Sequence, residues 1–212
     1  RRASCSPGCW PCRGCCSWPS SWSSCSDPPG SDQPNRSPPG SDLPNRPGAG
    51  ALDIARAFGV STEVVDHRAY ATREAFDAAI VAAIDRSEPD LVVLAGFMRV
   101  LGRDAVEHYA GRLVNIHPSL LPAYPGLHTH RRAIADGAAM HGCTVHFVTP
   151  EVDVGPIIAQ SALPVRNDDD EASLAGRILV EEHLAYPEAL RRLLSQRWYI
   201  EGRRLRLPAG PE

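Results

Sequence analysis

A short apolar segment that runs into a turn rich in proline and glycine constrains the fold most. Residues 113–116 have the composition of a buried β-strand, and strand alternation places Asn115 and His117 on the same face. Three prolines within residues 118–125 restrict the backbone of the loop that follows. We therefore expect an amide and an imidazole at the carboxyl end of a strand, where open α/β sheets bind their ligands.

The segments around this loop alternate between helical and strand patterns. The continuous apolar run at 91–97 is typical of a central parallel strand, and Thr72 is the expected N-cap of a helix. The alternation predicts an α/β fold with a Rossmann-like, mostly parallel sheet, helices on both faces and an antiparallel C-terminal part. The expected helices cover residues 51–58, 72–86, 103–109, 131–136 and 167–195, and the expected strands cover 60–65, 91–97, 113–116, 143–148 and 157–165, followed by a hairpin at 198–207.

Residues 1–48 differ sharply from the rest of the chain. The first 50 residues hold half of the 20 prolines and six of the seven cysteines, without hydrophobic periodicity. Such a segment is predicted to be disordered, because it buries too little apolar surface to offset its ordering entropy. Its composition is also that of GC-rich DNA read out of frame, so we interpret 1–48 as a low-complexity or out-of-frame segment and 49–212 as the folded domain. The three cysteines spaced C-x₂-C-x₂-C lack a second half at zinc-site spacing, so no metal is expected.

Bulk properties exclude several classes of protein. The net charge is −3 and basic runs are short, which makes nucleic acid an unexpected partner. All 22 basic residues are arginine, so a lysine Schiff base is excluded. The longest apolar run, 91–98, is too short to span a bilayer, and no secretory signal is evident. We expect no membrane partner, a cytoplasmic location, and a monomer or homodimer.

Two sequence motifs indicate a function more specifically than any of their residues does alone. Alone, Asn115, His117 and the Asp153 of Asp-x-Gly-Pro would be interpreted as turn residues, and His146 as a packed strand residue. The run from Asn115, Asn-x-His-Pro-Ser-Leu-Leu-Pro, however, resembles the signature of the folate-dependent formyltransferases. Its continuation, Tyr-Pro-Gly-Leu-His-Thr-His at 124–130, resembles the branch that formylates glycinamide ribonucleotide in purine synthesis. The resemblance extends from about residue 51 to about residue 194 and identifies 49–212 as a formyltransferase domain.

The resemblance implies a site and its ligands. Its small-molecule substrates would be glycinamide ribonucleotide and the co-substrate 10-formyltetrahydrofolate, with no metal. In the implied chemistry the Asn115 amide stabilises the oxyanion, His117 donates a proton, and Asp153 pairs with the imidazole. The implied catalytic residues are Asn115, His117 and Asp153, the implied folate-binding residues are Arg73, Met98, Arg99, Val100, Leu101 and Asn115, and the implied substrate-binding residue is Glu182.

Alternatives remain open at this point. Water in place of the amine would make the chain a 10-formyltetrahydrofolate hydrolase, and another formyltransferase acceptor is also compatible with the motif. The resemblance implies a buried first strand, a glycine-rich phosphate-binding loop near residues 20–22 and a first helix. No such loop is found in the sequence, so we expect the first strand and helix to be missing, and Gly48-Ala-Gly50 is a weak substitute for the loop. The chain is thus also compatible with an inactive folate-binding fragment, and we expect transfer activity far below that of a complete relative.

Overall fold

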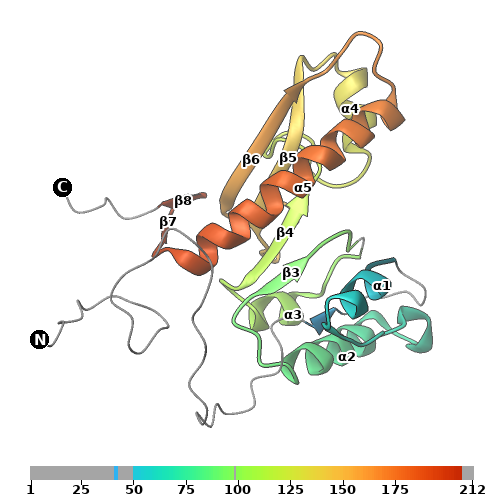
Figure 1. Cartoon of the computed structure of the whole chain (residues 1–212), viewed down its shortest axis with the longest axis vertical. Helices are drawn as coiled ribbons and strands as arrows, with labels where there is room; N and C mark the ends of the chain where they lie inside the picture. The colour runs from blue at the N-terminus through green and yellow to red at the C-terminus, as the bar shows by residue number, and fades with distance from the viewer. Residues whose placement is uncertain (1–40, 43–49, 98, 207–212) are drawn as a thin grey trace, which may run out of the picture. The chain divides into compact units, whose positions relative to one another are not determined.

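The computed structural model describes residues 41–42, 50–97 and 99–206 (Figure 1). These residues all belong to one unit, Ser37–Glu212. The predicted disorder of 1–48 and the implied phosphate loop near 20–22 lie outside the described residues, apart from Ser41–Asp42, which form the short strand β1. Met98 also lies outside them.

A mixed six-stranded sheet organises the described residues, in the order β3-β4-β5-β6-β8-β7. The pairs β3–β4 and β6–β8 are parallel, whereas β4–β5, β5–β6 and β7–β8 are antiparallel. The α/β class and the antiparallel C-terminal part are therefore confirmed. The strands of this sheet are β3 Val92–Leu94, β4 Leu113–His117, β5 Met140–Phe147, β6 Ile157–Pro164, β7 Tyr199–Glu201 and β8 Arg204–Arg206, and β1 pairs separately with β2 (Ser61–Thr62) in parallel.

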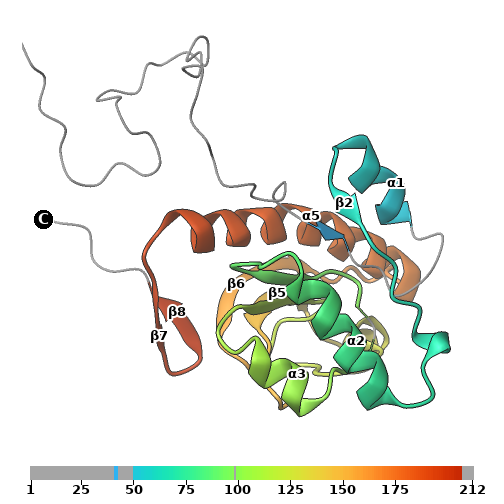
Figure 2. The same cartoon turned by 90° about the horizontal axis from the view of Figure 1, so that it is seen from below.

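Helices cover both faces of the sheet, as predicted (Figure 2). On one face, Val114 and Val145 pack against Tyr186 of the long helix α5. On the other, Leu113 packs against Val106 of α3. The helices are α1 Gly50–Ala57, α2 Arg73–Asp85, α3 Arg103–His108, α4 Thr129–Ala135 and α5 Glu171–Ser195, with a 3₁₀ turn η1 at His67–Ala69.

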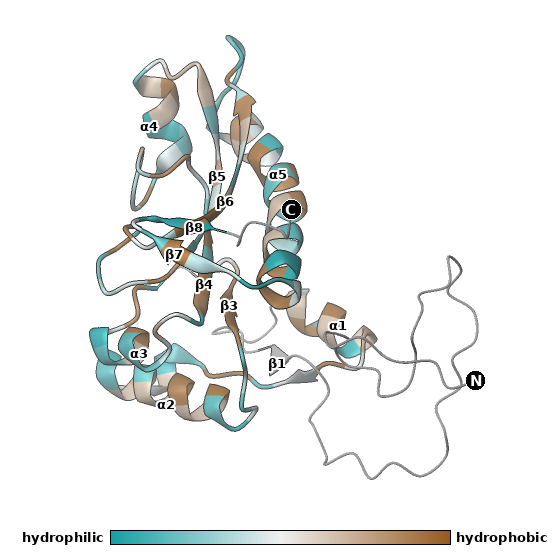
Figure 3. Cartoon of the chain, turned by 90° about the vertical axis from the view of Figure 1, so that its left-hand side faces the viewer, coloured by the Kyte–Doolittle hydropathy of each residue, from teal (hydrophilic) through white to brown (hydrophobic). Residues whose placement is uncertain are grey.

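The apolar strands lie inside and the polar helix surfaces outside, as Figure 3 shows for β3 and β4. Val114 and Val145 have no exposed surface, because α5 covers them. Burial of this apolar surface is the main driving force for assembling the layers. Across the described residues, no helix combines the length and the hydrophobicity that a membrane span requires.

The start of α5 differs from the prediction. We expected the helix from residue 167, but it begins at Glu171 because Asp170 is its N-cap. The Asp170 carboxylate accepts from the Ser173 amide (2.7 Å), and the Ser173 hydroxyl accepts from the Asp170 amide (2.9 Å). This capping box gives acceptors to the Asp170 and Ser173 amides, which have no acceptor within the helix, and so fixes the beginning of α5 at this point. Two predicted strands are also shorter than expected, since 60–65 contains only β2 and 91–97 contains only β3.

Thr72 is the N-cap of α2, as predicted, and gives a test of the local fold. Its hydroxyl accepts from the Ala75 amide at 3.2 Å. Replacing Thr72 by alanine should lower the free energy of unfolding by about 1 kcal/mol, because that amide loses its acceptor. Urea unfolding measures the change, and Thr72→Ser, which keeps the acceptor, should stay close to wild type. Equal losses in both variants would contradict the capping role.

Candidate functional site

The register between β4 and β5 gathers four polar side chains on one face of the sheet. Asn115 pairs with His146, and His117 pairs with Thr144, in the antiparallel ladder. Directly paired residues project to the same side of a sheet, and so do residues two apart along a strand. Because the adjacent residue Val114 packs beneath α5, the polar set faces away from that helix. Asn115 and His117 therefore lie on the same face of the sheet, as predicted.

His117 lies buried between two acceptor oxygens. Its Nε2 donates to the carbonyl oxygen of Tyr124 (3.0 Å), and its Nδ1 is 3.5 Å from Oδ2 of Asp153. The residue is only 6% exposed. Each ring nitrogen therefore has an oxygen acceptor beside it. The structure thus brings together the imidazole and the carboxylate that the sequence separates by 36 positions.

A tight turn after β5 presents the Asp153 carboxylate. Asp153 has a φ of 58°, in the left-handed region that few residues other than glycine adopt. Its Oδ2 accepts a hydrogen bond from the Gly126 amide at 2.7 Å. Gly155 allows the chain to return to the sheet, since a Cβ there would lie 1.8 Å from the carbonyl oxygen of Phe147. The two residues of the Asp-x-Gly-Pro motif therefore have different roles. Asp153 faces His117, and Gly155 lets the backbone lie close to the Phe147 carbonyl.

His146 belongs to the same cluster, although the sequence suggested only a packed strand residue. Its Nδ1 donates to the carbonyl oxygen of Phe147 (2.9 Å), so in the neutral ring Nε2 is an acceptor. Asn115 Nδ2 lies 3.4 Å from that Nε2, and Asp153 Oδ1 lies 3.8 Å from it. Burial lowers the pKa of His146, which keeps the ring neutral and able to accept from Asn115. The signal that would have found His146 is its position opposite Asn115, which requires the strand register.

The loop after His117 is held by buried hydroxyl groups. Ser119 has no exposed surface, and its hydroxyl donates to the carbonyl oxygen of Ala123 (2.7 Å). The Thr144 hydroxyl donates to the Ser119 carbonyl (2.6 Å) and accepts from the Leu121 amide (3.0 Å). These bonds fasten the loop to β5 next to His117. Ser119 is therefore a turn hydroxyl rather than a nucleophile aimed at a substrate.

The residues implied for folate binding lie around α2 and the loop between β3 and α3. The Arg99 guanidinium stacks over the Phe76 ring, 5.1 Å from its centroid, whereas Val100 is 57% exposed. Leu101 is half-buried against the apolar cluster of β3 and α3. Since Leu94 pairs with Asn115, this loop starts directly beside the candidate catalytic strand.

Arg73 lies farther from the catalytic strand, in the first turn of α2. Its Nε is 3.7 Å from Oδ2 of Asp77, which also accepts from the Gly102 amide at 2.7 Å. Arg73 lines a cleft of about 530 Å³ between α2 and α3. The carboxylate of Asp77 thus links Arg73 to the same loop that carries Arg99.

Glu182 is not brought to the His117–Asp153 pair. It lies on α5, the helix that packs against the opposite face of β4 and β5. Burial raises the pKa of the Cys143 thiol on that face, and the negative charge of Glu182 adds to the shift. Burial raises the pKa of the Glu182 carboxyl itself, and His183 opposes that shift. Among the described residues Glu182 forms no ion pair with an arginine, and no group of three or more His, Cys, Asp or Glu side chains could hold a metal ion.

Comparison with known proteins now defines the class. The formyl transferase family matches residues 43–190, and the chain belongs to that family. It is 48% identical over 152 residues to the phosphoribosylglycinamide formyltransferase of Escherichia coli (strain K12), covering 72% of this chain and 69% of that protein. The crystal structure of glycinamide ribonucleotide transformylase 1 from Symbiobacterium toebii is similar with a TM-score of 0.75 and 47% identity, covering 79% of each chain. A trifunctional purine biosynthetic protein, adenosine-3 of Drosophila melanogaster, is 48% identical over 149 residues, which is 70% of this chain and 11% of that protein.

A pair of histidines beside this site predicts how stability depends on pH. His130 Nδ1 and His141 Nε2 are 3.2 Å apart, and burial lowers the pKa of His141 from 6.5 to about 4. Below pH 6.5 the His141 side chain is protonated in the unfolded chain, but in the folded chain it stays neutral down to about pH 4. The unfolded chain therefore binds more protons in this window, and the free energy of unfolding falls as the pH falls from 6.5 to 4.

Replacing His141 by glutamine should flatten that dependence. The loss of unfolding free energy between pH 6.5 and 4 should become shallower by up to about 1.4 kcal/mol per pH unit, the limit for one proton. Urea unfolding at pH 8, 7, 6 and 5 measures both slopes, and the two curves should run parallel at and above pH 7. Parallel curves across the whole range would contradict a neutral, buried His141.

Proposed function

We propose that the chain transfers a formyl group from 10-formyltetrahydrofolate to the amine of glycinamide ribonucleotide, a step of purine biosynthesis, in the cytoplasm. The observation that carries the proposal is the pairing of His117 with Asp153, 3.5 Å apart and nearly buried, beside the amide of Asn115 on the same sheet face. Membership of the formyl transferase family and the likeness to proteins named for this reaction support the same choice.

The reaction needs a donor for the formyl oxygen and a proton for the leaving nitrogen. The co-substrate supplies the formyl carbon, and attack by the amine places negative charge on the carbonyl oxygen. Asn115 Nδ2 carries two N–H donors. One lies toward His146 Nε2 at 3.4 Å, which leaves the other for the oxyanion. His146 thereby acts as a positioning residue that fixes the orientation of the amide.

His117 and Asp153 are assigned the proton chemistry: His117 gives a proton to the leaving nitrogen, and the proton that the attacking amine loses returns to this pair. A protonated His117 can donate from Nε2 once substrate displaces the Tyr124 carbonyl from its 3.0 Å contact. The carboxylate of Asp153 stabilises the charged ring, and its contact with the Gly126 amide keeps it in place before substrate binds. These three side chains need no nucleophilic serine.

The remaining implied residues are assigned to substrate binding. Arg99, Val100 and Leu101 lie in the loop that begins beside Asn115, and Arg73 lines the neighbouring cleft, so we assign them to formyl-folate. The exposed Val100 offers an apolar surface for a flat ring, and both arginines offer charge to its carboxylates. Glu182 is assigned to the amine substrate because the resemblance to the family implies that role, and its half-buried carboxylate on α5 has no arginine partner among the described residues.

The test is formyl transfer by this chain, followed by product analysis. Replacing Asn115 or His117 by alanine should lower the transfer rate by about 10²- to 10³-fold, because an oxyanion donor or a general acid is lost. The exposed Asn167, which precedes α5, provides the matched control, and Asn167→Ala should keep the wild-type rate. Circular dichroism checks that the variants stay folded.

Three outcomes would change the assignment. Release of formate without formylated amine would make the chain a hydrolase. Transfer at the full rate by His117→Ala would remove the proposed proton donor. Binding of a folate analogue without any turnover by the wild-type chain would leave a folate-binding fragment.

A further inference from the structure

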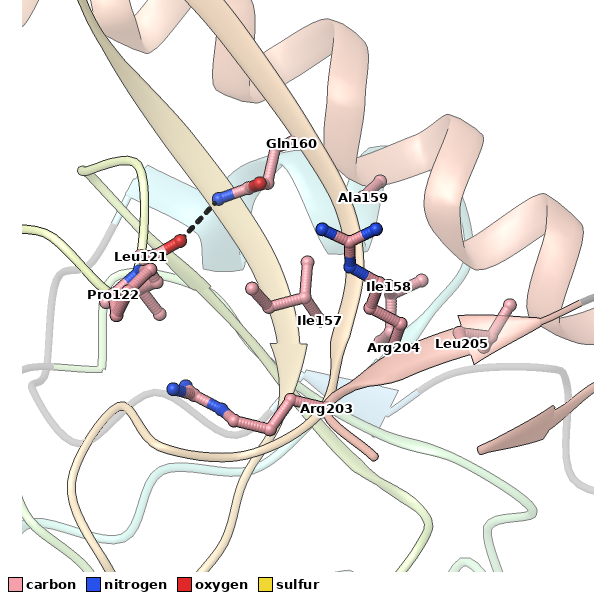
Figure 4. Close-up of a pocket in the computed structure, with 9 residues that line it drawn as sticks. All are labelled: Leu121, Pro122, Ile157, Ile158, Ala159, Gln160, Arg203, Arg204 and Leu205. Carbon is pink, nitrogen blue, oxygen red and sulfur yellow. Dashed lines mark hydrogen bonds between the residues drawn. The ribbon is translucent and has the colours of Figure 1, made fainter. Parts of the chain in front are cut away.

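A second cleft lies beside β6 (Figure 4). It has a volume of about 580 Å³, within the range of small-molecule sites. Three separate segments form it: the loop after β4, the first half of β6, and the turn that opens β8. We call it the Arg203–Arg204 cleft, and its lining residues are Leu121, Pro122, Ile157, Ile158, Ala159, Gln160, Arg203, Arg204 and Leu205.

The charge of this cleft is one-sided. Two of its lining residues are arginines and none is acidic. Within the described residues Arg204 has no side-chain partner, whereas Arg206, two residues further on, pairs with Glu201 at 2.8 Å. Arg203 uses one guanidinium donor, on the carbonyl oxygen of Asp153 (3.3 Å), and a guanidinium has five. Most of the donor capacity of both arginines therefore faces the cleft and solvent.

The cleft is also held in shape before anything binds. The Gln160 amide nitrogen donates to the Leu121 carbonyl and to the Thr144 hydroxyl, each at 2.9 Å, which ties the loop to the sheet. On the other side, the Ile157 amide donates to the Arg203 carbonyl at 2.7 Å. Sites that are ordered in advance lose less conformational freedom on binding.

We propose that the Arg203–Arg204 cleft binds a small organic anion, through a carboxylate or a phosphate group on the arginines and an apolar body on Leu121, Pro122 and Ile157. Figure 4 shows the two arginine side chains extending on either side of Ile157, so the charged groups border an apolar floor. Guanidinium groups suit both kinds of anion, because their paired N–H donors match two oxygens. The binding of the anion is independent of the proposed function.

The cleft communicates with the candidate active site through Arg203. The same guanidinium that faces the cleft holds the Asp153 carbonyl, and Asp153 presents its carboxylate to His117 at 3.5 Å. An anion that draws Arg203 toward the cleft releases this hold on the Asp153 turn. Occupation of the cleft should therefore lower turnover, an effect that rests on the proposed function.

Calorimetry of the full chain tests the binding without any use of turnover. Succinate and inorganic phosphate, each titrated at constant low ionic strength, are the probes for the carboxylate and the phosphate class. We expect saturable binding of at least one probe, and an affinity about tenfold lower in Arg204→Gln, because a charge-assisted contact is lost. Arg197→Gln is the matched control, since Arg197 is exposed, follows α5 and does not line the cleft.

The outcomes separate the two parts of the proposal. Equal weakening in Arg204→Gln and Arg197→Gln, or no saturable binding of either probe, would overturn the site. Stronger binding of succinate than of phosphate assigns the site to carboxylates, and the reverse order assigns it to phosphates. In the transfer assay the binding probe should lower turnover of wild type and of Arg197→Gln but spare Arg204→Gln, and turnover that is unaffected at saturation would overturn the link to Asp153.

Discussion

The burial of the Asp153 carboxylate organises the candidate active site. The side chain of Asp153 is only 10% exposed, and a charge removed from water is costly unless donors replace its hydration. The replacements come from distant parts of the chain: the Gly126 amide from the loop after β4, and His117 from β4 itself. The turn, the loop and β4 are thus held to one another by the need to satisfy a single anion.

The same region contains several residues in an unfavourable backbone conformation. Tyr124, His128 and Asp153 have φ values of 55°, 59° and 58°, although none is glycine. Each such residue is strained by on the order of 1 kcal/mol or more, and persists only where the surroundings determine it. Here the determinants are the bonds just described, together with the His117 bond to the Tyr124 carbonyl. Strain concentrated next to the buried His117–Asp153 pair is characteristic of functional sites, and it agrees with the proposed role of the loop.

Sequence patterns sufficed where the decisive interaction is local. Strand alternation alone placed Asn115 beside His117, and the hydroxyl of Thr72 marked the beginning of α2. The boundary of α5 was wrong because four acidic or amide residues in a row, 167–170, all suit a helix start, and only Asp170 finds the reciprocal bond with Ser173. Propensity does not distinguish such neighbours.

The parts that escaped prediction depend on non-local pairing. His146 belongs to the site because it lies opposite Asn115 in the sheet, and the sequence of β5 alone does not indicate that pairing. Arg203 reaches the Asp153 turn from 50 positions away, through a hairpin whose pairing with β6 rests on Ile157 and Arg204. Glu182 lies on the apolar helical stripe that the sequence predicts, and this stripe packs on the sheet face opposite to the one that carries the catalytic candidates.

The ladder between β4 and β5 makes the site an all-or-none assembly. Shifting one strand by a single residue against the other would turn every side chain of that strand to the opposite face of the sheet, so that in β4 Val114 and Ile116 would take the places of the amide and the imidazole. Polar rings would then be forced under α5, where Val114 and Val145 now lie without exposed surface. Misalignment would therefore abolish the core and the chemistry together, and no partly functional register can accumulate as a stable alternative.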